Sequence, residues 1–143
     1  MSQDAVFTKV DPDLLPVLAE LESREPIFHR EKFGVSIADF ESAADENYWE
    51  VGASGRRYSR AFILSWAGES AAHFVDAAAA GWTTEEFGLR CLGPDTFLLT
   101  YTLDQAGRRT RRATIWQKAE GRWKILYHQG TVIAAEEDDV IPK

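Results

Sequence analysis

Three side chains, Glu25, His29 and His128, are candidates for proton-transfer chemistry. At about 100° per residue, Glu25 falls inside the apolar stripe of the first expected helix, which directs a carboxylate toward the core. His29 follows four residues later, a spacing at which two side chains meet on one helix face. A carboxylate removed from water has a raised pKa, and a neighbouring imidazole can take or share its proton. The pair therefore has the properties of a general base, with His128 as the candidate second acid.

The same residues also fit roles without catalysis. Glu25 can accept hydrogen bonds from an arginine or from backbone amides and so hold the chain near Pro26, or it can contact a ligand. Pro26 is expected to kink or split the helix, which would rotate His29 relative to Glu25. A metal site normally needs several convergent ligands, and Glu25, His29 and His128 lack any diagnostic local motif. We expect neither a metal nor an organic cofactor.

The direction in which His128 points depends on the turn in "KAEGRW". A one-residue change in register exchanges the two faces of a strand. Glu120 and Gly121 make a poor type I′ pair, whereas Ala119 and Glu120 followed by Gly121 in the left-handed region make a good three-residue turn with a bulge. The pairs predicted from this turn are Lys118 with Arg122, Thr114 with Leu126, and Arg112 with His128.

This register predicts one shared face on two strands, with Arg112, Thr114, Trp116, Leu126 and His128 on it and with Ile125, Tyr127 and Gln129 on the opposite face. An apolar wall with a few convergent polar groups is typical of a small-molecule pocket, where Arg112 would stabilise an anion or oxyanion. Trp and Arg are also enriched in subunit interfaces, so the face is equally consistent with a dimer surface or with plain core.

Glu50 and Tyr58 are further candidates, on either side of the segment "ASGR". The pattern predicts two short extended pieces around a glycine turn. The two side chains would then line the mouth of the pocket, or instead form hydrogen bonds between strands. The segment is too short for a phosphate-binding loop, and Ser54 lacks the strand-to-helix elbow of a serine hydrolase.

The first helix must position Glu25. Asp13 is a good N-cap, and Pro16 falls in the first turn, where an N–H has no intrahelical partner. The apolar positions that recur at helical spacing are Leu14, Leu18, Leu21 and Phe28.

Further helices are expected before residue 81. Ser36 and Asp39 form a pair like a capping box ahead of a short second helix. Ser59 can cap a third helix, and an alanine-rich helix is predicted over residues 70–80, closed by Gly81.

From Thr83 onward the pattern changes to four long alternating runs separated by the short turn-formers "GPD", "DQAG" and "AEG". Such runs predict an antiparallel meander, and its apolar face must be covered by the N-terminal helices. The predicted fold class is therefore α+β, with helices packed in a curved antiparallel sheet. We expect one domain over residues 1–143, with an acidic tail at 134–143.

Composition narrows the function classes. The 143 residues fit one domain, and 45% apolar residues suffice for a core. Cys91 has no partner for a disulfide, and the first residues do not resemble an export signal, so a cytoplasmic protein is expected. No apolar run reaches the roughly 18 residues of a membrane span. The net charge of −7, with Arg111 and Arg112 on opposite strand faces, argues against nucleic-acid binding.

Three blocks of the sequence resemble the nuclear-transport-factor-2-like superfamily: "LESREPIFHR", "WEVGASGRRYSR" and "TRRATIWQKAEGRWKILYHQGT". The resemblance runs from about Leu14 to Val132 and is nearest to a bacterial branch of unknown function related to SnoaL-like proteins and ketosteroid isomerase. It implies a cone-shaped, cystatin-like α+β roll with a pocket at its open end, and frequent dimerisation through the sheet. The first-helix tyrosine of ketosteroid isomerase has no counterpart here, where Phe28 stands, which argues against steroid isomerisation.

One fold hosts many functions, so two hypotheses are carried forward. In the first, a homodimeric protein binds a small, partly apolar molecule and, if it is an enzyme, isomerises, cyclises or hydrolyses it by proton transfer. In the second, the chain is a ligand-binding or assembly module without catalysis, in which Glu25 and His128 complete buried polar networks.

Overall fold

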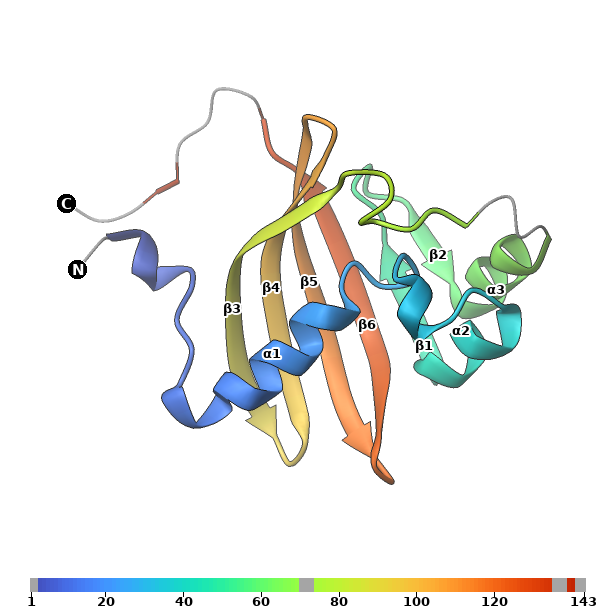
Figure 1. The fold of residues 1–143 in the computed structure, drawn as a ribbon, viewed down its shortest axis with the longest axis horizontal. Helices are drawn as coiled ribbons and strands as arrows, with labels where there is room; N and C mark the ends of the chain where they lie inside the picture. Colours follow the sequence, from blue (N-terminus) through green and yellow to red (C-terminus); the bar gives the residue numbers. More distant parts are fainter. Residues whose placement is uncertain (1–2, 70–73, 135–138, 141–143) are drawn as a thin grey trace.

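The computed structural model describes residues 3–69, 74–134 and 139–140. Over these ranges the α-helices are α1 Leu15–Arg24, α2 Ile37–Ala43 and α3 Arg60–Glu69, and the strands are β1 Ala44–Val51, β2 Arg57–Ser59, β3 Thr83–Gly93, β4 Thr96–Gln105, β5 Arg108–Ala119 and β6 Arg122–Val132. The six strands form one sheet in the order β2-β1-β6-β5-β4-β3 (Figure 1). The predicted α+β class is confirmed.

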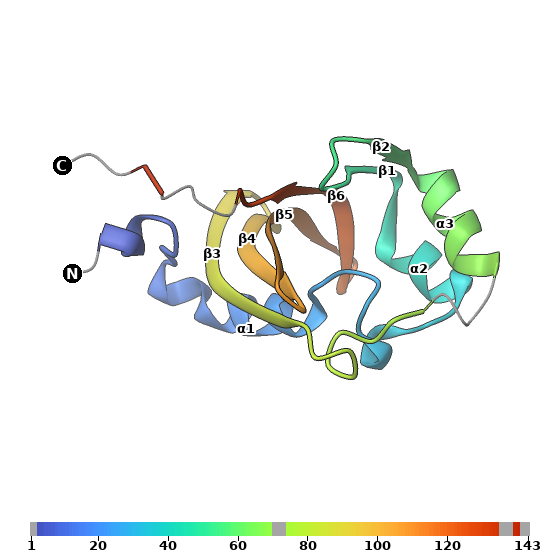
Figure 2. The ribbon, with the colours of Figure 1, turned by 90° about the horizontal axis from the view of Figure 1, so that it is seen from above.

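The sheet is a meander extended at one edge. β3, β4, β5 and β6 pair in sequence as antiparallel neighbours, as predicted. β1 then pairs with β6 in the parallel direction, and β2 closes an antiparallel hairpin on β1. Figure 2 shows that the sheet is strongly curved and open, with α1 lying across its concave side. α2 and α3 lie beside β1 at the far end of the curve.

The first α-helix is shorter than the sequence predicts. Asp11 caps a 3-10 turn by accepting a hydrogen bond from the Asp13 amide, and α1 follows and ends at Arg24. A proline disfavours helical geometry in the residue before it, and Glu25 before Pro26 is extended, with φ −105° and ψ 147°. Of the two outcomes predicted for Pro26, a kink or a split, the split is observed, so the helix does not reach Phe28 and the i, i+4 pairing of Glu25 with His29 does not form.

Local capping signals predicted the other helix starts. Ser36 and Asp39 form a full capping box at α2, and the Ser59 hydroxyl accepts a hydrogen bond from the Phe62 amide at the start of α3. The helix predicted over 70–80 is not found in its described part. Residues 70–73 lie outside the described residues, and residues 74–80 form a loop that ends in a turn before Gly81.

The β5–β6 turn is a two-residue turn at Glu120 and Gly121, and the predicted three-residue turn is wrong. Ala119 pairs with Arg122, and both Glu120 and Gly121 have positive φ, 53° and 76°, as a type I′ turn requires. A two-residue turn alone would send His128 outward. However, Trp116 pairs with Ile125 whereas Ile115 pairs with Tyr127.

Leu126 is therefore an extra residue in β6, and this bulge shifts the register by one further residue, which returns His128 to the side of Thr114. Thr114 now pairs with His128, and Arg112 with Gly130, so the predicted pairs are wrong. His128 is nevertheless buried on the same side of the sheet as Thr114 and Trp116, as predicted. Ile125, predicted on the opposite face, is buried in the core.

The core lies between α1 and the concave face of the sheet. Leu21 of α1 is fully buried against strand residues such as Leu99, Leu103 and Ile125. Burying a leucine or isoleucine side chain contributes roughly 1.5–3 kcal/mol, so these contacts hold the helix on the sheet. An edge-to-face contact between Trp116 and Trp123, with ring centroids 6.4 Å apart, closes the core at the β5–β6 end.

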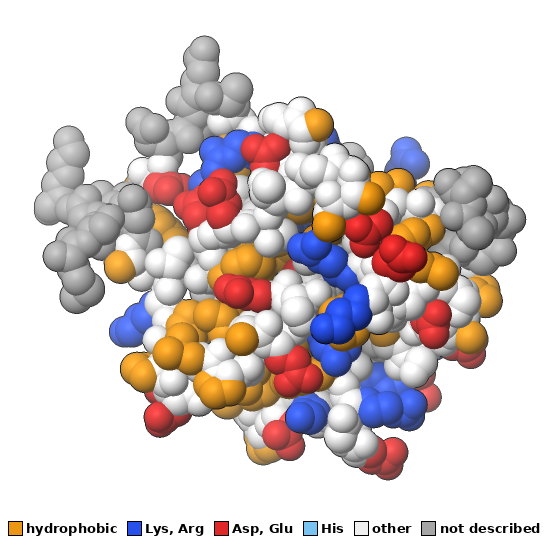
Figure 3. All heavy atoms as spheres, viewed as in Figure 1, with side chains coloured by type: hydrophobic (Ala, Val, Ile, Leu, Met, Phe, Trp, Pro, Cys, Tyr) orange, Lys and Arg blue, Asp and Glu red, His pale blue; other side chains and the backbone are white. Residues whose placement is uncertain are grey.

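The surface has mixed charge. On the face seen in Figure 3, acidic and basic side chains are interspersed with exposed hydrophobic ones. None of the helices in the described part of the chain is long and apolar enough to cross a membrane.

Candidate functional site

A cavity of about 150 Å³, here called the inner cavity, lies between the segment after α1, the helices α2 and α3, and the strands β1, β5 and β6. Four of the predicted site residues line it, namely His29, Glu50, Arg112 and His128. The opposite wall is apolar and includes Phe28, Phe40, Ile63 and Trp66. Polar groups therefore converge on one side of a space that is hydrophobic on the other.

The sheet places three of the polar residues on neighbouring strands. Glu50 of β1 pairs in parallel register with His128 of β6, and Arg112 of β5 pairs with Gly130 of β6. A Cβ atom at position 130 would come within 3.1 Å of the carbon and two nitrogens of the Arg112 guanidinium. Glycine at this position therefore leaves the space that the arginine head occupies.

The contacts of His128 define its tautomer. Its Nε2 lies 3.4 Å from Nη1 of Arg112, and its Nδ1 lies 2.7 Å from the Thr114 hydroxyl oxygen. Arginine only donates hydrogen bonds, so Nε2 is the acceptor and Nδ1 carries the proton that is donated to Thr114. Burial and the Arg112 charge lower the pKa of His128 to about 3. The ring is neutral at pH 7, which favours an acceptor role over the predicted role of second acid.

Glu25 lies behind His128 and outside the lining of the inner cavity. Its side chain is fully buried and accepts hydrogen bonds from the Ile27 amide (3.2 Å), the Tyr101 hydroxyl (2.7 Å) and the Trp116 indole (3.0 Å). The Thr114 hydroxyl also acts on it as a donor. Burial raises the pKa of Glu25, while all these donors act in the opposite direction. This arrangement matches the interpretation of Glu25 as a member of a buried network.

His29 lies apart from Glu25, on the segment that follows α1. Its Nδ1 is 3.0 Å from the Val75 carbonyl oxygen, which only accepts, so Nδ1 carries the proton. The ring packs edge-to-face on Trp82 with centroids 5.1 Å apart. Burial lowers the pKa of His29, so a second neutral imidazole borders the cavity.

Glu50 is the carboxylate that faces the inner cavity. It accepts a hydrogen bond of 2.8 Å from the Tyr48 hydroxyl. Burial raises the pKa of Glu50, and the bond from Tyr48 and the charge of Arg112 lower it. Tyr48 was not predicted as a site residue, although alternation along β1 places residues two apart on the same face.

Arg112 brings the positive charge. Its Nε donates to the Thr110 hydroxyl at 2.9 Å, and Nη1 donates toward His128. Among the described residues, no carboxylate lies within 4.0 Å of its guanidinium. The direct contacts of this cation are therefore with neutral groups.

The remaining predicted residues, Thr114, Trp116 and Tyr58, do not line the inner cavity. Thr114 is fully buried between His128 and Glu25, and Trp116 is buried in the core. Tyr58 packs on Phe62 with ring centroids 5.5 Å apart. In the described ranges, no group of three or more His, Cys, Asp or Glu side chains is arranged to hold a metal ion.

No protein-family model matches this sequence, and no curated protein matches it. Solved structures do match. An NTF2-like protein from Cytophaga hutchinsonii superposes with a TM-score of 0.60 and 11% identity over 87% of this chain and 100% of that one. The chain has the nuclear-transport-factor-2-like fold.

Two further solved structures match this chain. A protein of unknown function from the DUF3225 family of Pectobacterium atrosepticum has a TM-score of 0.62 and 17% identity, covering 87% of this chain and 94% of that one. A cystatin-like fold protein from Burkholderia xenovorans has a TM-score of 0.62 and 14% identity, covering 87% and 95%. At these identities the likeness shows the nuclear-transport-factor-2-like fold alone, and activity must be argued from the cavity.

Proposed function

We propose that the protein binds a small, partly apolar molecule in the inner cavity. The proposal rests on the convergence of four polar side chains on one cavity. His29, Glu50, Arg112 and His128 come from four separate segments and meet on one side of a cavity whose other side is aromatic and aliphatic. An apolar enclosure with a few oriented polar groups is the usual form of a small-molecule site.

The volume limits the ligand. Sites for drug-sized molecules measure about 300–1,000 Å³, and the inner cavity measures about 150 Å³. An apolar cavity of roughly this size accommodates benzene. The expected ligand is therefore a single ring or a short branched chain with one or two polar groups.

Filling the cavity tests the proposal. Ile63 lines the cavity and the neighbouring Phe62 does not, although both belong to α3. Wild type, Ile63→Trp and Phe62→Trp are screened by thermal shift against a panel of small metabolites, and hits are measured by titration calorimetry. We expect Ile63→Trp to lose the hits and Phe62→Trp to keep them. A wild type that binds no panel member, or hits that bind Ile63→Trp unchanged, would contradict the proposal.

Proton transfer is a second candidate function, and Glu50 favours it. A carboxylate with a raised pKa near a partly buried arginine can remove a proton from carbon while the arginine stabilises the resulting oxyanion. Each ligand from the screen is incubated with the protein in D₂O, and exchange of its carbon-bound protons is followed by NMR. We expect Glu50→Gln to keep binding and lose exchange, and Glu46→Gln, which alters an exposed residue of β1, to keep both. Equal exchange in Glu50→Gln would exclude Glu50 as the base.

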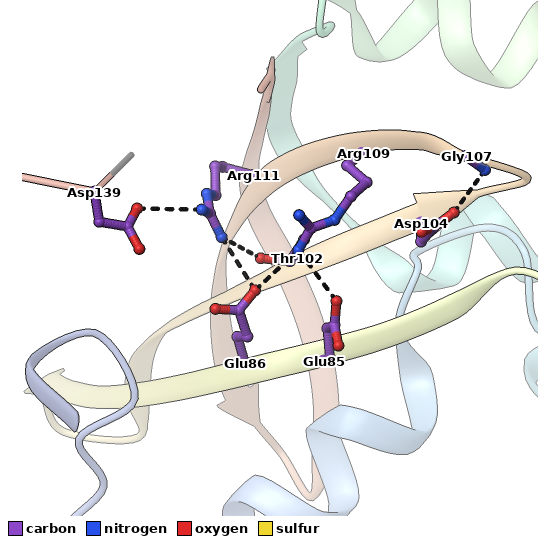
Figure 4. A network of polar contacts seen from close by, with 8 residues as sticks. All are labelled: Glu85, Glu86, Thr102, Asp104, Gly107, Arg109, Arg111 and Asp139. Atoms are coloured by element: carbon purple, nitrogen blue, oxygen red, sulfur yellow. Dashed lines mark hydrogen bonds and ion pairs between the residues drawn. The ribbon is translucent and has the colours of Figure 1, made fainter. Parts of the chain in front are cut away.

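We further propose that the outer face of the sheet pairs with a second copy of this chain. A shallow groove of about 560 Å³ crosses this face and contains Leu98, Ile115 and Tyr127. At its edge Arg111 contacts Glu86 and Asp139, within a network that also joins Arg109 and Glu85 (Figure 4). A two-fold interface must be self-complementary, and an apolar groove with both charge signs at its edge meets that condition.

A further inference from the structure

We propose that the ligand of the inner cavity is a small organic monoanion, an apolar ring or short chain with one carboxylate or equivalent group bound by Arg112. This inference rests on the proposed binding function and names the chemical class of the ligand.

The first argument is the charge of Arg112. It is the one lysine or arginine among the described residues that line the cavity. Its guanidinium is held by Thr110 and directed at Nε2 of His128, which as a neutral acceptor brings no counter-charge. Arg112 is partly buried, and a partly buried cation without an ion pair is costly. A ligand carboxylate would supply the missing partner through charge-assisted hydrogen bonds.

The second argument is that the neighbouring groups permit an anion. His29 and His128 are neutral, and Glu25 is enclosed by its own donors away from the cavity. The only acidic side chain in the described lining is Glu50, whose surroundings are the Tyr48 hydroxyl, the charge of Arg112 and its strand neighbour His128. A ligand anion next to Glu50 raises the pKa of that carboxyl further, so Glu50 takes up a proton and becomes a donor, and proton removal by Glu50 is then restricted to uncharged ligands.

The number of charges in the cavity limits the charge of the ligand. One guanidinium balances one negative charge, and the remaining described wall, including Phe28, Phe40 and Ile63, is apolar. A second ionised group on the ligand would be buried without a partner, which is strongly unfavourable. Dianions are therefore excluded, and the apolar body is limited to the size of one ring.

The experiment compares three probes of similar shape by titration calorimetry at pH 7, namely benzoate, benzyl alcohol and phthalate. We expect wild type to bind benzoate at least ten-fold more tightly than benzyl alcohol and to show no binding of phthalate. Repeating the benzoate titration in buffers of different ionisation enthalpy should show proton uptake, which Glu50→Gln abolishes.

Arg112→Met tests the anion site, with Arg111→Met as the matched control, because Arg111 lies next to it in β5 and contacts Glu86 and Asp139 instead of the cavity. The preference for benzoate should disappear in the first variant and persist in the second. If Arg112→Met does not fold, Gly130→Ala keeps the arginine and displaces its guanidinium, and should weaken benzoate binding while benzyl alcohol binding is unchanged.

The outcomes separate the inference from the function on which it rests. Tighter binding of benzyl alcohol than of benzoate, equal benzoate affinity in wild type and Arg112→Met, or a metabolite screen with only neutral hits overturns the monoanion inference and leaves cavity binding intact. A wild type that binds none of the probes and no member of the metabolite panel overturns both.

Discussion

A series of polar residues crosses the protein from the inner cavity to the core. Arg112 donates toward Nε2 of His128, Nδ1 of His128 donates to Thr114, and the Thr114 hydroxyl acts as a donor to Glu25. His128 and Thr114, both neutral, thus lie between Arg112 and Glu25. Arg112 can only donate and the Glu25 carboxylate can only accept, so these two residues determine the direction of the hydrogen bonds between them. In a low-dielectric interior such a network orients each member, so a change at Glu25 reaches the imidazole in the cavity.

Replacement of Glu25 by glutamine should therefore destabilise the protein. The amide would bring N–H groups into a shell made of the donors Ile27, Tyr101 and Trp116. Leaving such groups unsatisfied costs about 1–3 kcal/mol in the free energy of unfolding, measured by urea denaturation at pH 7. Glu20→Gln, on the exposed side of α1, is the control and should change stability by less than about 0.5 kcal/mol.

The pH dependence of the Glu25→Gln deficit has a defined sign. The pKa of Glu25 is raised above its ordinary value of 4.5, so the folded protein holds this proton more tightly than the unfolded chain. Wild type loses the corresponding stability as the pH rises above about 4.5, and the variant cannot. The deficit should therefore shrink with rising pH, and a deficit that grows would show that the native state favours the carboxylate.

His128 should make the protein sensitive to acid. Its pKa is lowered from 6.5 to about 3 in the folded protein, so the unfolded chain binds a proton between these values that the folded protein excludes. Stability from this group is complete above pH 6.5 and falls as the pH drops, by roughly 2 kcal/mol between pH 6.5 and pH 5. His128→Asn, which can still donate to Thr114, should lose this slope, while His29→Asn keeps most of it. Parallel urea titrations of all three proteins at both pH values would decide the matter.

At the level of elements, the β5–β6 hairpin determines which side chains face the cavity. The two-residue turn alone would place His128 on the outer face of the sheet. The extra residue at Leu126 returns His128 to the concave face. The bulged register buries both Ile125 and His128 on the concave side, whereas the turn alone would expose one of them. Packing of the core therefore selects the bulge.

A substitution in the β5–β6 turn should increase the stability of the protein. Glu120 has φ 53°, a left-handed conformation that asparagine adopts more readily than glutamate. Glu120→Asn should stabilise the protein by about 0.5–1 kcal/mol and raise Tm by roughly 2–4 °C, measured by calorimetry. Glu120→Ala, without this preference, is the control. If asparagine lowers Tm, Glu120 contributes a contact beyond the turn.

At the level of the whole molecule, the curved sheet has two faces with different surroundings. The concave face holds α1, as Figure 2 shows. The strands β1, β5 and β6 border the inner cavity, and the groove that contains Ile115 lies on the outer face. If a second copy covers the outer face, Ile115→Glu should halve the molar mass measured by light scattering, because a charge would be buried in the interface. Val35→Glu, at an exposed position before α2, should leave the mass unchanged. A wild type that is already monomeric at micromolar concentration would refute the second copy.

How much was predictable from the sequence depends on the range of the interactions. The capping box at Ser36 and Asp39, the cap at Ser59 and the four alternating runs after Thr83 are signals within a few residues, and each predicted its element. Pro26 predicted a kink or a split in the first helix by the same local logic, and the helix ends at Arg24. These local signals were sufficient for the α+β class.

The candidate site depends on contacts between residues far apart in the sequence, which no local pattern predicts. Glu25 was predicted beside His29 on one helix face, but the chain becomes extended before Pro26 and Tyr101 and Trp116 enclose the carboxylate instead. Glu50 is the carboxylate that reaches the cavity, because β1 pairs in parallel with β6 and stands next to His128. That pairing joins segments about 80 residues apart and is decided by burial of both strands.

The sequence by itself thus determined the starts of α2 and α3, the four strands after Thr83, and that His128, Arg112 and Thr114 would share a face. Only the tertiary structure decided the register of the β5–β6 hairpin that produces this face. The two-residue turn and the bulge each shift the register by one residue, and burial of Ile125 in the core requires both. It also decided that Glu50 and Arg112 would border one cavity while Glu25 is enclosed behind it, since side chains meet according to strand pairing and burial rather than according to their spacing in the chain.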